Sequence, residues 1–507
     1  MIKYLIAHDL GTSGNKASLF TTEGQYIGST ICEYNTDYFN SNWAVQDPQD
    51  WWRAVCETNK LLTKNIDTRD VIAICFSGQM MGCVCVDRNG QALRKAIIWA
   101  DMRATKQADQ ILSKIDKDDF YRTTGHKCSS SYSIEKLMWV RDNEPDIYNK
   151  TYKMLNPKDY IVTRLTGRFL TDYSDASGTN AFDLNTFKWS EKILDAAGID
   201  MDKLPEAVPS THIAGEISES IAAECGLYPG TRVVMGGGDG VCASVGAGSV
   251  LLGKTYNCLG SSSWIATTTK EPIYDDQYRT FNWAHIVPGF VAPCGTMQSA
   301  GASFAWLKNQ ICTSEVMEAK QKGISPYDLI NEEISQSTIG SNGLIFLPYL
   351  LGERSPRWNP EAKGAFIGLK LEHKRADILR SVIEGIAYNL NIILQVFRNH
   401  IDIDEITVIG GMAKGKIQRR ILADVFNTRL ITLNYLDEAS SIGAAVCAGV
   451  ATGELKDFSE VEKFNSIVAQ DDPIPENAAA YAKYMPIFDK CYASLVDVYA
   501  DLAKLAR

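Results

Sequence analysis

Two glycine-rich turns of the same kind lie about half a chain apart, and they constrain the fold more than any other feature. Residues 2–9 are apolar and β-rich, Gly11-Thr12-Ser13-Gly14 makes a turn, and a strand-like segment resumes at Lys16. The plan recurs at 255–267, where Gly260-Ser261-Ser262-Ser263 makes the turn. Aligning residue 9 with residue 258 gives an offset of 258 − 9 = 249, close to half of the 507 residues. The spacing indicates two homologous halves, each opened by a β-hairpin.

Strands and helices alternate around these hairpins, which predicts an α/β fold. With about 150 residues per domain, the length favours two or three domains. We expect an N-terminal domain at 1–247 and a C-terminal domain at 248–507, with the ligand cleft between them. Further strands are predicted at 71–76, 96–99, 231–235, 344–347 and 406–409, and helices at 133–141, at 240–248, near 301 and at about 376–400.

The composition excludes some classes of binding partner but says little about the type of reaction. Lys+Arg 51 against Asp+Glu 61 leaves a net charge of −10, which argues against nucleic acid or an anionic membrane and favours a small-molecule substrate. No run reaches the roughly 18 apolar residues of a membrane helix, and we expect a cytoplasmic protein. The 13 cysteines are odd in number and several, such as Cys75 and Cys242, lie in apolar segments, which predicts buried thiols. The six histidines never pair at helical spacing, so no histidine metal site is expected.

The two turns suit a polyphosphate. Backbone N–H groups and the hydroxyls of Thr12, Ser13, Ser261 and Ser262 can point at phosphate oxygens. Only the first hairpin carries an acid, Asp9, whose carboxylate suits an Mg²⁺ ion that keeps several waters. The alternative is two ordinary hairpins.

Asp239 follows Gly236-Gly237-Gly238 at the end of a buried strand. Ligands of α/β folds bind at that end of the strands, where a carboxylate can accept a proton from an attacking hydroxyl. The alternative is a helix N-cap, a position that Asp also serves well.

Two further segments predict a site for a polyhydroxylated ligand. Gln79, Met80 and Met81 follow one predicted strand, and Trp99 and Asp101 follow the next, which brings an amide, an aromatic face and a carboxylate to one cleft edge. Core filling is the alternative for the two methionines. Separately, the run 410–413 (Gly-Gly-Met-Ala) after a buried strand permits close approach by a flat ring, or makes a tight βα turn.

One phosphate-loop string is misleading. Residues 248–255, Gly-Ser-Val-Leu-Leu-Gly-Lys-Thr, satisfy the GxxxxGK(S/T) pattern. A true loop of this kind follows a strand and starts a helix at its Lys, whereas here a small-residue helical stretch precedes and a β-like segment follows. The apolar residues 250–252 are expected to be core.

Longer strings resemble the FGGY family of carbohydrate kinases. Two of its signatures are present, Ser131-Tyr-Ser-Ile-Glu-Lys136-Leu-Met-Trp139-Val-Arg-Asp-Asn143 and Gly364-Ala-Phe-Ile-Gly368-Leu369 continuing to Ser381-Val-Ile-Glu384. The resemblance runs from residue 9 to about 453. Within the family the chain is most similar to the xylulokinases, through Asp9-Leu-Gly-Thr-Ser-Gly-Asn-Lys16, Trp43-Ala-Val-Gln-Asp-Pro48, Asp172-Tyr-Ser-Asp-Ala-Ser-Gly178 and Leu347-Pro-Tyr-Leu-Leu-Gly-Glu-Arg-Ser-Pro356.

The resemblance implies a two-domain ribonuclease-H-like, actin-like fold, and ATP and Mg²⁺ as cofactors. It implies ATP-dependent phosphorylation of a sugar, foremost D-xylulose to D-xylulose 5-phosphate. By matching position, Asp239 is the catalytic base, Asp9 organises Mg²⁺, and Thr12, Ser13 and Lys16 lie near the transferring phosphate. The sugar pocket is implied at Gln79, Met80, Met81, Trp99, Asp101 and Trp264, and the nucleotide site at Gly260, Ser261, Gly301, Gly410, Gly411, Met412 and Gly415.

One departure leaves the substrate open. Xylulokinases typically have Gly-Gln-Met-His-Gly where this chain has Met81 in place of the His, so a partner for a sugar hydroxyl is lost. Alternatives are a kinase for ribulose, gluconate, glycerol or erythritol, a non-catalytic sugar or nucleotide sensor, and an actin-like polymerising ATPase. A homodimer is the default assembly.

Overall fold

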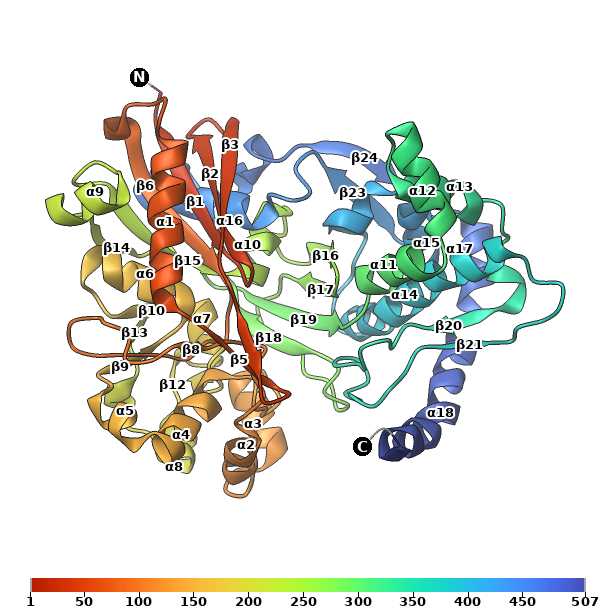
Figure 1. Cartoon of the computed structure of the whole chain (residues 1–507), viewed down its shortest axis with the longest axis horizontal. Coiled ribbons are helices and arrows are strands. Elements are labelled where there is room, and N and C mark those ends of the chain that lie inside the picture. Colours follow the sequence, from red (N-terminus) through yellow and green to blue (C-terminus); the bar gives the residue numbers. More distant parts are fainter. Residues whose placement is uncertain (1, 506–507) are drawn as a thin grey trace.

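The computed structural model describes residues 2–505 and contains two large sheets, drawn on the left and right of Figure 1. In the N-terminal sheet the strand order is β14-β15-β6-β1-β2-β3. Its β1 is an apolar run whose side chains are buried on both faces, as expected of a central strand. The bounds are β1 Tyr4–Leu10, β2 Gly14–Thr21, β3 Tyr26–Glu33, β6 Val71–Gly78, β14 Ile213–Glu216 and β15 Arg232–Gly238.

The C-terminal sheet repeats this plan, with the strand order β18-β19-β17-β16-β22-β23-β24. In each half an antiparallel hairpin (β1–β2, β16–β17) continues on one side into two parallel strands (β6 and β15, β22 and β23) and ends in an antiparallel edge strand (β14, β24). The predicted duplication is thus confirmed in the topology. The bounds are β16 Thr255–Leu259, β17 Ser263–Thr267, β18 Phe281–Ala284, β19 Val291–Met297, β22 Glu405–Ile409, β23 Arg429–Leu433 and β24 Ile467–Asp471.

Helices cover both sheets, which confirms the α/β class. In the N-terminal half they are α1 Pro48–Leu62, α2 Thr105–Leu112, α3 Lys117–Thr124, α4 Ser133–Asn143, α5 Pro145–Lys150, α6 Pro157–Thr166, α7 Tyr173–Ser177, α8 Glu191–Ala197, α9 Glu219–Cys225 and α10 Asp239–Gly246. In the C-terminal half they are α11 Gly301–Gln310, α12 Thr313–Lys322, α13 Pro326–Ile334, α14 Arg375–Arg398, α15 Lys416–Phe426, α16 Ala439–Thr452, α17 Pro475–Ala482 and α18 Met485–Leu505.

The halves join through α10 and α16, which lie between the two sheets in Figure 1. A Cβ at Gly246 of α10 would lie 1.9 Å from the Ala439 carbonyl oxygen, and one at Gly443 of α16 would lie 1.9 Å from the Cys242 carbonyl oxygen. Only glycine permits this approach of the two backbones. Both helices belong to one apolar cluster with residues of β1 and β6, so the junction is core.

Short strands form the rest of the β-structure. Residues 96–99 were expected to form a buried strand, but only Ala96–Ile97 (β8) does so, and it pairs with β5 in a small separate sheet. The Ile98 N–H still donates to the Ala44 carbonyl of β5 at 3.2 Å, and the chain turns at Trp99, whose indole N–H donates to Thr12 of the first hairpin. The remaining strands are β4 Asp37–Phe39, β5 Trp43–Gln46, β7 Val84–Val86, β9 Lys153–Leu155, β10 Leu170–Asp172, β11 Phe182–Asp183, β12 Lys188–Trp189, β13 Glu206–Val208, β20 Ile345–Leu347 and β21 Ala365–Ile367.

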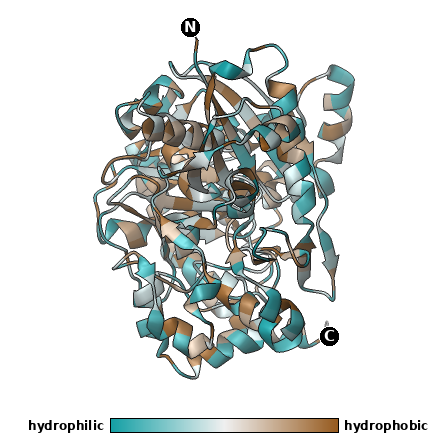
Figure 2. Cartoon of the chain, turned by 90° about the vertical axis from the view of Figure 1, so that its left-hand side faces the viewer, coloured by the Kyte–Doolittle hydropathy of each residue, from teal (hydrophilic) through white to brown (hydrophobic). Residues whose placement is uncertain are grey.

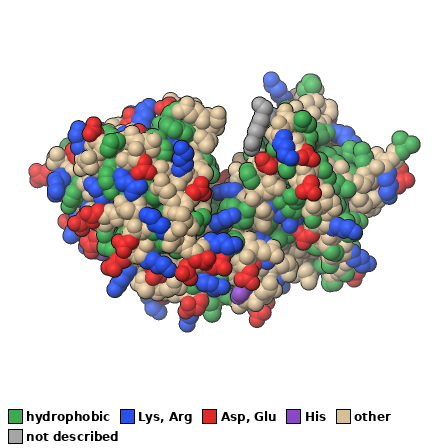
Figure 3. Space-filling view, turned by 90° about the horizontal axis from the view of Figure 1, so that it is seen from below, with side chains coloured by type: hydrophobic (Ala, Val, Ile, Leu, Met, Phe, Trp, Pro, Cys, Tyr) green, Lys and Arg blue, Asp and Glu red, His purple; other side chains and the backbone are tan. Residues whose placement is uncertain are grey.

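The surface is hollowed between two lobes, as the view from below shows (Figure 3). Apolar residues concentrate in the interior and hydrophilic ones on the outer helices (Figure 2). Cys75 and Cys242 are buried free thiols, as predicted. Within residues 2–505, no helix combines the length and the apolar character needed to cross a membrane.

Candidate active site

Three parallel strand ends bring the predicted catalytic residues together. Gly78 of β6 is the register partner of Leu10 at the end of β1 and of Gly238 at the end of β15. Asp9, Gln79 and Asp239 therefore lie at the same edge of the N-terminal sheet. Ligands of open α/β sheets bind at this edge.

Asp239 is the first residue of α10, and its carboxylate is half-buried. Its Oδ1 accepts from the Gly240 N–H at 2.7 Å, while the N-cap position belongs to Gly238, so the capping alternative is not what the structure shows. Burial and the negative charge of Asp9 together raise the pKa of Asp239 to about 7, against the opposing effect of the Gly240 N–H. A carboxylate with a pKa near neutrality is suited to accept a proton at physiological pH.

Asp9 lies on β1 opposite Lys16 and Ser77 in the strand register. Its Oδ1 accepts from the Ser77 hydroxyl at 3.0 Å. Burial raises its pKa, and the charge of Lys16 and the Ser77 hydrogen bond lower it. Two carboxylates whose charges disfavour one another, Asp9 and Asp239, form a fitting environment for a divalent cation, because the cation relieves the repulsion.

The first turn is surrounded by the predicted sugar-site side chains. The Trp99 indole N–H donates to the Thr12 hydroxyl at 2.9 Å, and the Gln79 amide donates to the Gly11 carbonyl at 3.3 Å. Gln46, which sequence reasoning missed, donates to the Thr12 carbonyl at 2.6 Å and accepts from Gln79 at 2.8 Å. Ser13 is exposed at the tip of the turn. The amide of Gln79 is therefore already engaged, which leaves its buried, unpartnered carbonyl oxygen Oε1.

Lys16 crosses from the N-terminal half to the C-terminal half. Its Nζ donates to the Asp437 carbonyl at 2.5 Å and forms an ion pair with Glu438 at 3.1 Å. Its ammonium is thus held at the end of the sheet that carries Asp9, by residues directly before α16.

The two methionines differ in their surroundings. Met80 is buried, and its Sδ would lie 2.3 Å from a Cβ at Gly238, so it fills the core beneath Asp239. Met81 is half-buried, has a φ of 61°, and its carbonyl accepts from Lys136 at 2.7 Å. The core alternative therefore holds for Met80, whereas Met81 keeps a partly open side chain in a strained backbone conformation.

Trp264 of β17 is connected to the start of α10 through hydrogen bonds of the Tyr256 hydroxyl. Its indole N–H donates to the Tyr256 hydroxyl at 2.7 Å, and that hydroxyl donates to the Gly240 carbonyl at 2.5 Å. This chain of hydrogen bonds places an aromatic residue of the C-terminal half beside Asp239.

Asp101 differs from the sequence expectation. Its side chain is completely buried, and its oxygens accept from the Ala44 N–H at 2.6 Å and from the Arg103 guanidinium at 2.7 Å. Arg103 also lies 3.8 Å from the ring centroid of Trp43. Because both oxygens are occupied within this network, Asp101 does not present a free carboxylate to the cleft.

The predicted nucleotide residues line one cavity of about 660 Å³. The second turn meets the start of α11, where the N–H of Gly301 donates to the Gly260 carbonyl at 2.9 Å and that of Ala302 donates to the Ser261 carbonyl at 2.9 Å. Gly411, Met412 and Gly415 form another wall, while Gly410 lies behind it against Leu259. A Cβ at Gly411 would meet open space, as expected beside a ligand.

Aromatic and amide side chains of this cavity escaped sequence reasoning. The rings of Phe304 and Tyr327 pack at a tilt, with centroids 4.7 Å apart, and Asn331 accepts from Gln418 at 2.5 Å. All four line the cavity. Their helical spacing is that of ordinary amphipathic helices, so the sequence carries no signal that distinguishes them. The mixture of flat rings, amides and glycines fits a nucleotide.

The structure confirms that residues 248–255 do not form a phosphate-binding loop of the GxxxxGK(S/T) type. Lys254 forms an exposed ion pair with Glu405 at 2.5 Å, and the next residue, Thr255, begins strand β16 rather than a helix. Val250 is buried, as expected, but Leu251 and Leu252 are 55% and 56% exposed, so the expectation that they are core was wrong. They lie in the turn that connects the halves, where neither sheet covers them.

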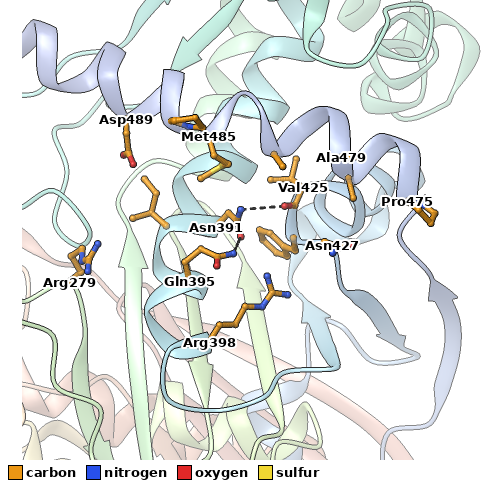
Figure 4. Close-up of a pocket in the computed structure, with 15 residues that line it drawn as sticks. Arg279, Asn391, Gln395, Arg398, Val425, Asn427, Pro475, Ala479, Met485 and Asp489 are labelled. Atoms are coloured by element: carbon orange, nitrogen blue, oxygen red, sulfur yellow. Dashed lines mark hydrogen bonds between the residues drawn. The ribbon is translucent and has the colours of Figure 1, made fainter.

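A second cavity, of about 820 Å³, lies between α14, α15, α17 and α18 (Figure 4). Its amides are bonded to the protein, since Asn391 donates to the Val425 carbonyl at 3.3 Å and accepts from Gln395 at 3.1 Å. None of the residues predicted from the sequence lines it.

Comparison with known proteins agrees with this geometry. Residues 4–246 match the N-terminal domain, and residues 255–452 the C-terminal domain, of the FGGY family of carbohydrate kinases. The chain belongs to this family. It is 30% identical to a gluconokinase of Bacillus subtilis (strain 168), with 100% of this chain and 99% of the relative covered, and 32% identical to a xylulose kinase of Staphylococcus xylosus, with 96% and 99% covered.

Solved structures extend the comparison to the fold. A gluconate kinase and a ligand-bound xylulose kinase, both from Lactobacillus acidophilus, each superpose with a TM-score of 0.91 at 27% identity, covering 99% of this chain and 100% of theirs. The protein is a carbohydrate kinase with the two-domain sugar-kinase fold. The kinase family implies ATP and a sugar as substrates.

Proposed function

We propose that this FGGY kinase transfers the γ-phosphoryl group of ATP to a hydroxyl of D-xylulose or a related ketose, with Asp239 as the general base. The observation that carries the proposal is the convergence of Asp239 and Asp9 at one strand edge, beside both glycine-rich turns. Relatives of similar identity are named xylulose kinase and gluconokinase, so D-gluconate is the second candidate substrate.

The chain's own residues supply positioning and proton transfer. Asp239 accepts the proton of the attacking hydroxyl, and Asp9 holds Mg²⁺ beside the first turn. Trp99 and Trp264 present aromatic faces to the sugar from the two halves. The backbone of the second turn and the residues at 411–415 border the nucleotide. When bound, Mg²⁺·ATP supplies the phosphoryl group and neutralises the charge of its oxygens.

We retain the domain boundary near residue 247 as part of this proposal. The two matched regions end at residue 246 and begin at residue 255, and each large sheet draws its strands from one side of that boundary. Closure of the two halves over the sugar would exclude water, which would otherwise hydrolyse ATP.

A screen of ADP release tests the proposal. Purified protein is mixed with Mg²⁺·ATP and one pentulose, hexulose, polyol or aldonate at a time, with a control that lacks sugar. We expect release to be stimulated most by D-xylulose or a close relative. Release that no sugar stimulates would contradict the proposal and favour a sensor or a polymerising ATPase.

A further inference from the structure

Four charged side chains are buried together beside the strand ends that carry the proposed base. The Lys158 ammonium forms ion pairs with three carboxylates, at 2.7 Å from Asp159, 2.8 Å from Asp172 and 3.0 Å from Asp175, and all four side chains are completely buried. Lys158 lies against the end of β6, because a Cβ at Gly78 would be 3.1 Å from the Lys158 Cβ. Burying charged groups is costly, and the proposed proton transfer and metal site use none of these four.

Ser174 connects this cluster to the backbone next to Asp239. Its hydroxyl donates to Asp172 Oδ2 at 2.6 Å and accepts from the backbone N–H of Gly238 at 2.9 Å. Ser174 is completely buried, and a Cβ at Gly237 would lie 2.9 Å from its Oγ. The short helix α7, which begins at residue 173, therefore packs directly against the end of β15.

The direction of these two hydrogen bonds follows from the groups that make them. A backbone N–H can only donate, and a carboxylate paired with a lysine can only accept. The single proton of the Ser174 hydroxyl therefore points to Asp172, and its oxygen accepts from Gly238. A hydrogen bond to a charged group is stronger than a neutral one and polarises the next bond in the chain. Asp172 thus holds Ser174 in place as the acceptor for the Gly238 N–H.

Gly238 is the residue at which the chain changes from strand to helix. It is the last residue of β15 and the N-cap of α10, and Asp239 follows it as the first helical residue. An aspartate side chain has only two torsions, so the direction of its carboxylate follows the backbone that carries it. A displacement of about 1 Å at a reacting group can cost about 100-fold in rate. The hydrogen bond from Gly238 to Ser174 therefore helps to fix the direction of the Asp239 carboxylate.

We propose that Ser174 is a positioning residue for Asp239. It accepts the Gly238 N–H, is held by Asp172 and Lys158, and keeps the Asp239 carboxylate in the orientation that accepts the proton of the attacking hydroxyl. The proposal rests on the proposed function, because it assumes that Asp239 is the general base. It gives a role to the buried charges and to the serine of the run 172–178, Asp-Tyr-Ser-Asp-Ala-Ser-Gly.

Ser210 provides a matched control. It is buried, and its hydroxyl donates at 2.8 Å to the same oxygen, Asp172 Oδ2, whereas the Gly238 N–H donates to Ser174. Ser174→Ala and Ser210→Ala each remove one donor from Asp172, but only Ser174→Ala also removes the acceptor of the Gly238 N–H. The difference between the two variants therefore measures the contact with Gly238.

Hydrogen exchange without any ligand tests this contact. Exchange of the backbone amides at 236–241 would be followed by mass spectrometry in the wild type and both variants. We expect Ser174→Ala to speed exchange in this segment by roughly 5- to 100-fold, because a buried N–H loses its partner, and Ser210→Ala to change it by less than about threefold. Ser174→Cys, a weaker acceptor of similar shape, should give an intermediate rate. Urea unfolding checks that each variant is folded, and Ser174→Cys replaces Ser174→Ala in every comparison if the latter is not.

Kinetics in two backgrounds test the consequence for the base. With Asp239 intact, Ser174→Ala should lower kcat by roughly 5- to 100-fold and leave the KM for ATP within about twofold, whereas Ser210→Ala should keep kcat within about threefold of the wild type. In the Asp239→Asn background, Ser174→Ala should lower kcat no further, because the group that it positions is already gone. A merely structural role would lower kcat by the same factor in both backgrounds.

The outcomes separate this role from the kinase assignment. Equal losses of kcat in the two backgrounds would overturn the role of Ser174, and so would exchange at 236–241 that is no faster in Ser174→Ala than in Ser210→Ala. Selectively faster exchange in a protein whose ADP release no sugar stimulates would support the positioning of Asp239 by Ser174 and contradict the proposed function alone. The exchange measurement needs no substrate, so it gives a result in either case.

Discussion

At the scale of single residues, Asp239 is a carboxyl whose surroundings raise its pKa well above the ordinary value. The carboxyl is half-buried, and burial together with Asp9 raises its pKa to about 7. Asp239→Asn keeps the shape and removes the base, so we expect kcat to fall on the order of 10² to 10⁴-fold while ATP still binds. Steady-state kinetics and ATP titration would measure both. Turnover within threefold of the wild type would reassign Asp239 to a structural role.

The same substitution has a pH signature. A folded-state pKa above the unfolded value means that the folded protein holds the proton more tightly, so the stability contributed by Asp239 is lost as pH rises toward 7. Asp239→Asn should therefore match the wild type near pH 4 and exceed its free energy of unfolding at pH 8. For the same reason, wild-type kcat/KM should rise as pH passes upward through about 7. Urea titrations at the two pH values provide the check, and a variant less stable at pH 8 would refute it.

Met81 carries the prediction on specificity. A thioether is only a weak acceptor, so a sugar hydroxyl buried against it without a partner costs roughly 1 to 3 kcal/mol, or about 5- to 150-fold in kcat/KM. Met81→His should shift preference toward D-xylulose by at least about tenfold relative to the best wild-type sugar. If the wild type already prefers D-xylulose and the variant gains nothing, another group or a water satisfies that hydroxyl.

At the scale of elements, the second turn and the start of α11 approach so closely that only glycine fits at position 301. A Cβ at Gly301 would lie 2.4 Å from the Gly260 carbonyl oxygen, whereas one at Gly28, on the edge strand β3, would meet nothing within 4 Å. Gly301→Ala should raise the KM for ATP and cost about 1 to 3 kcal/mol of stability. Gly28→Ala should change neither. Kinetics and thermal unfolding of the pair would decide, and an unchanged KM for Gly301→Ala would separate this turn from the nucleotide.

Substitutions in the first hairpin and in the misleading phosphate-loop string should have opposite effects on turnover. Asp9→Asn should raise the Mg²⁺ concentration needed for turnover, since it removes a charge from the ion's surroundings. Lys254→Ala should leave kcat nearly unchanged, because it breaks only an exposed ion pair, and such pairs contribute about 0 to 1 kcal/mol. Mg²⁺ titrations of the two variants would test both statements. A large loss of kcat in Lys254→Ala would instead indicate that residues 248–255 bind the phosphates.

At the scale of the whole molecule, the two halves meet through α10, α16 and Lys16, and we expect the ligands to bind in the cleft between them. Ligands that contact both halves should favour a closed arrangement. Small-angle scattering should therefore show a smaller radius of gyration with sugar and a non-hydrolysable ATP analogue together than with neither. Asp239→Asn, which leaves the cleft's shape intact, should close as the wild type does. A radius that no ligand combination changes would contradict closure.

The α/β class, the duplicated hairpins and most strand positions could be predicted from the sequence, because hydrophobic periodicity and glycine turns are local signals. Sequence patterns also predicted Asp9 and Asp239 as site residues, and the strand register brings both to one edge of the N-terminal sheet, because Asp9 lies near the end of β1 and Asp239 directly follows β15. The partners of the polar side chains became known from the three-dimensional contacts alone. Asp101 is neutralised by Arg103, Met80 fills the core, and Lys16 is held by Glu438. Hydrogen-bond partners from distant segments decide each of these cases, and no local pattern encodes them.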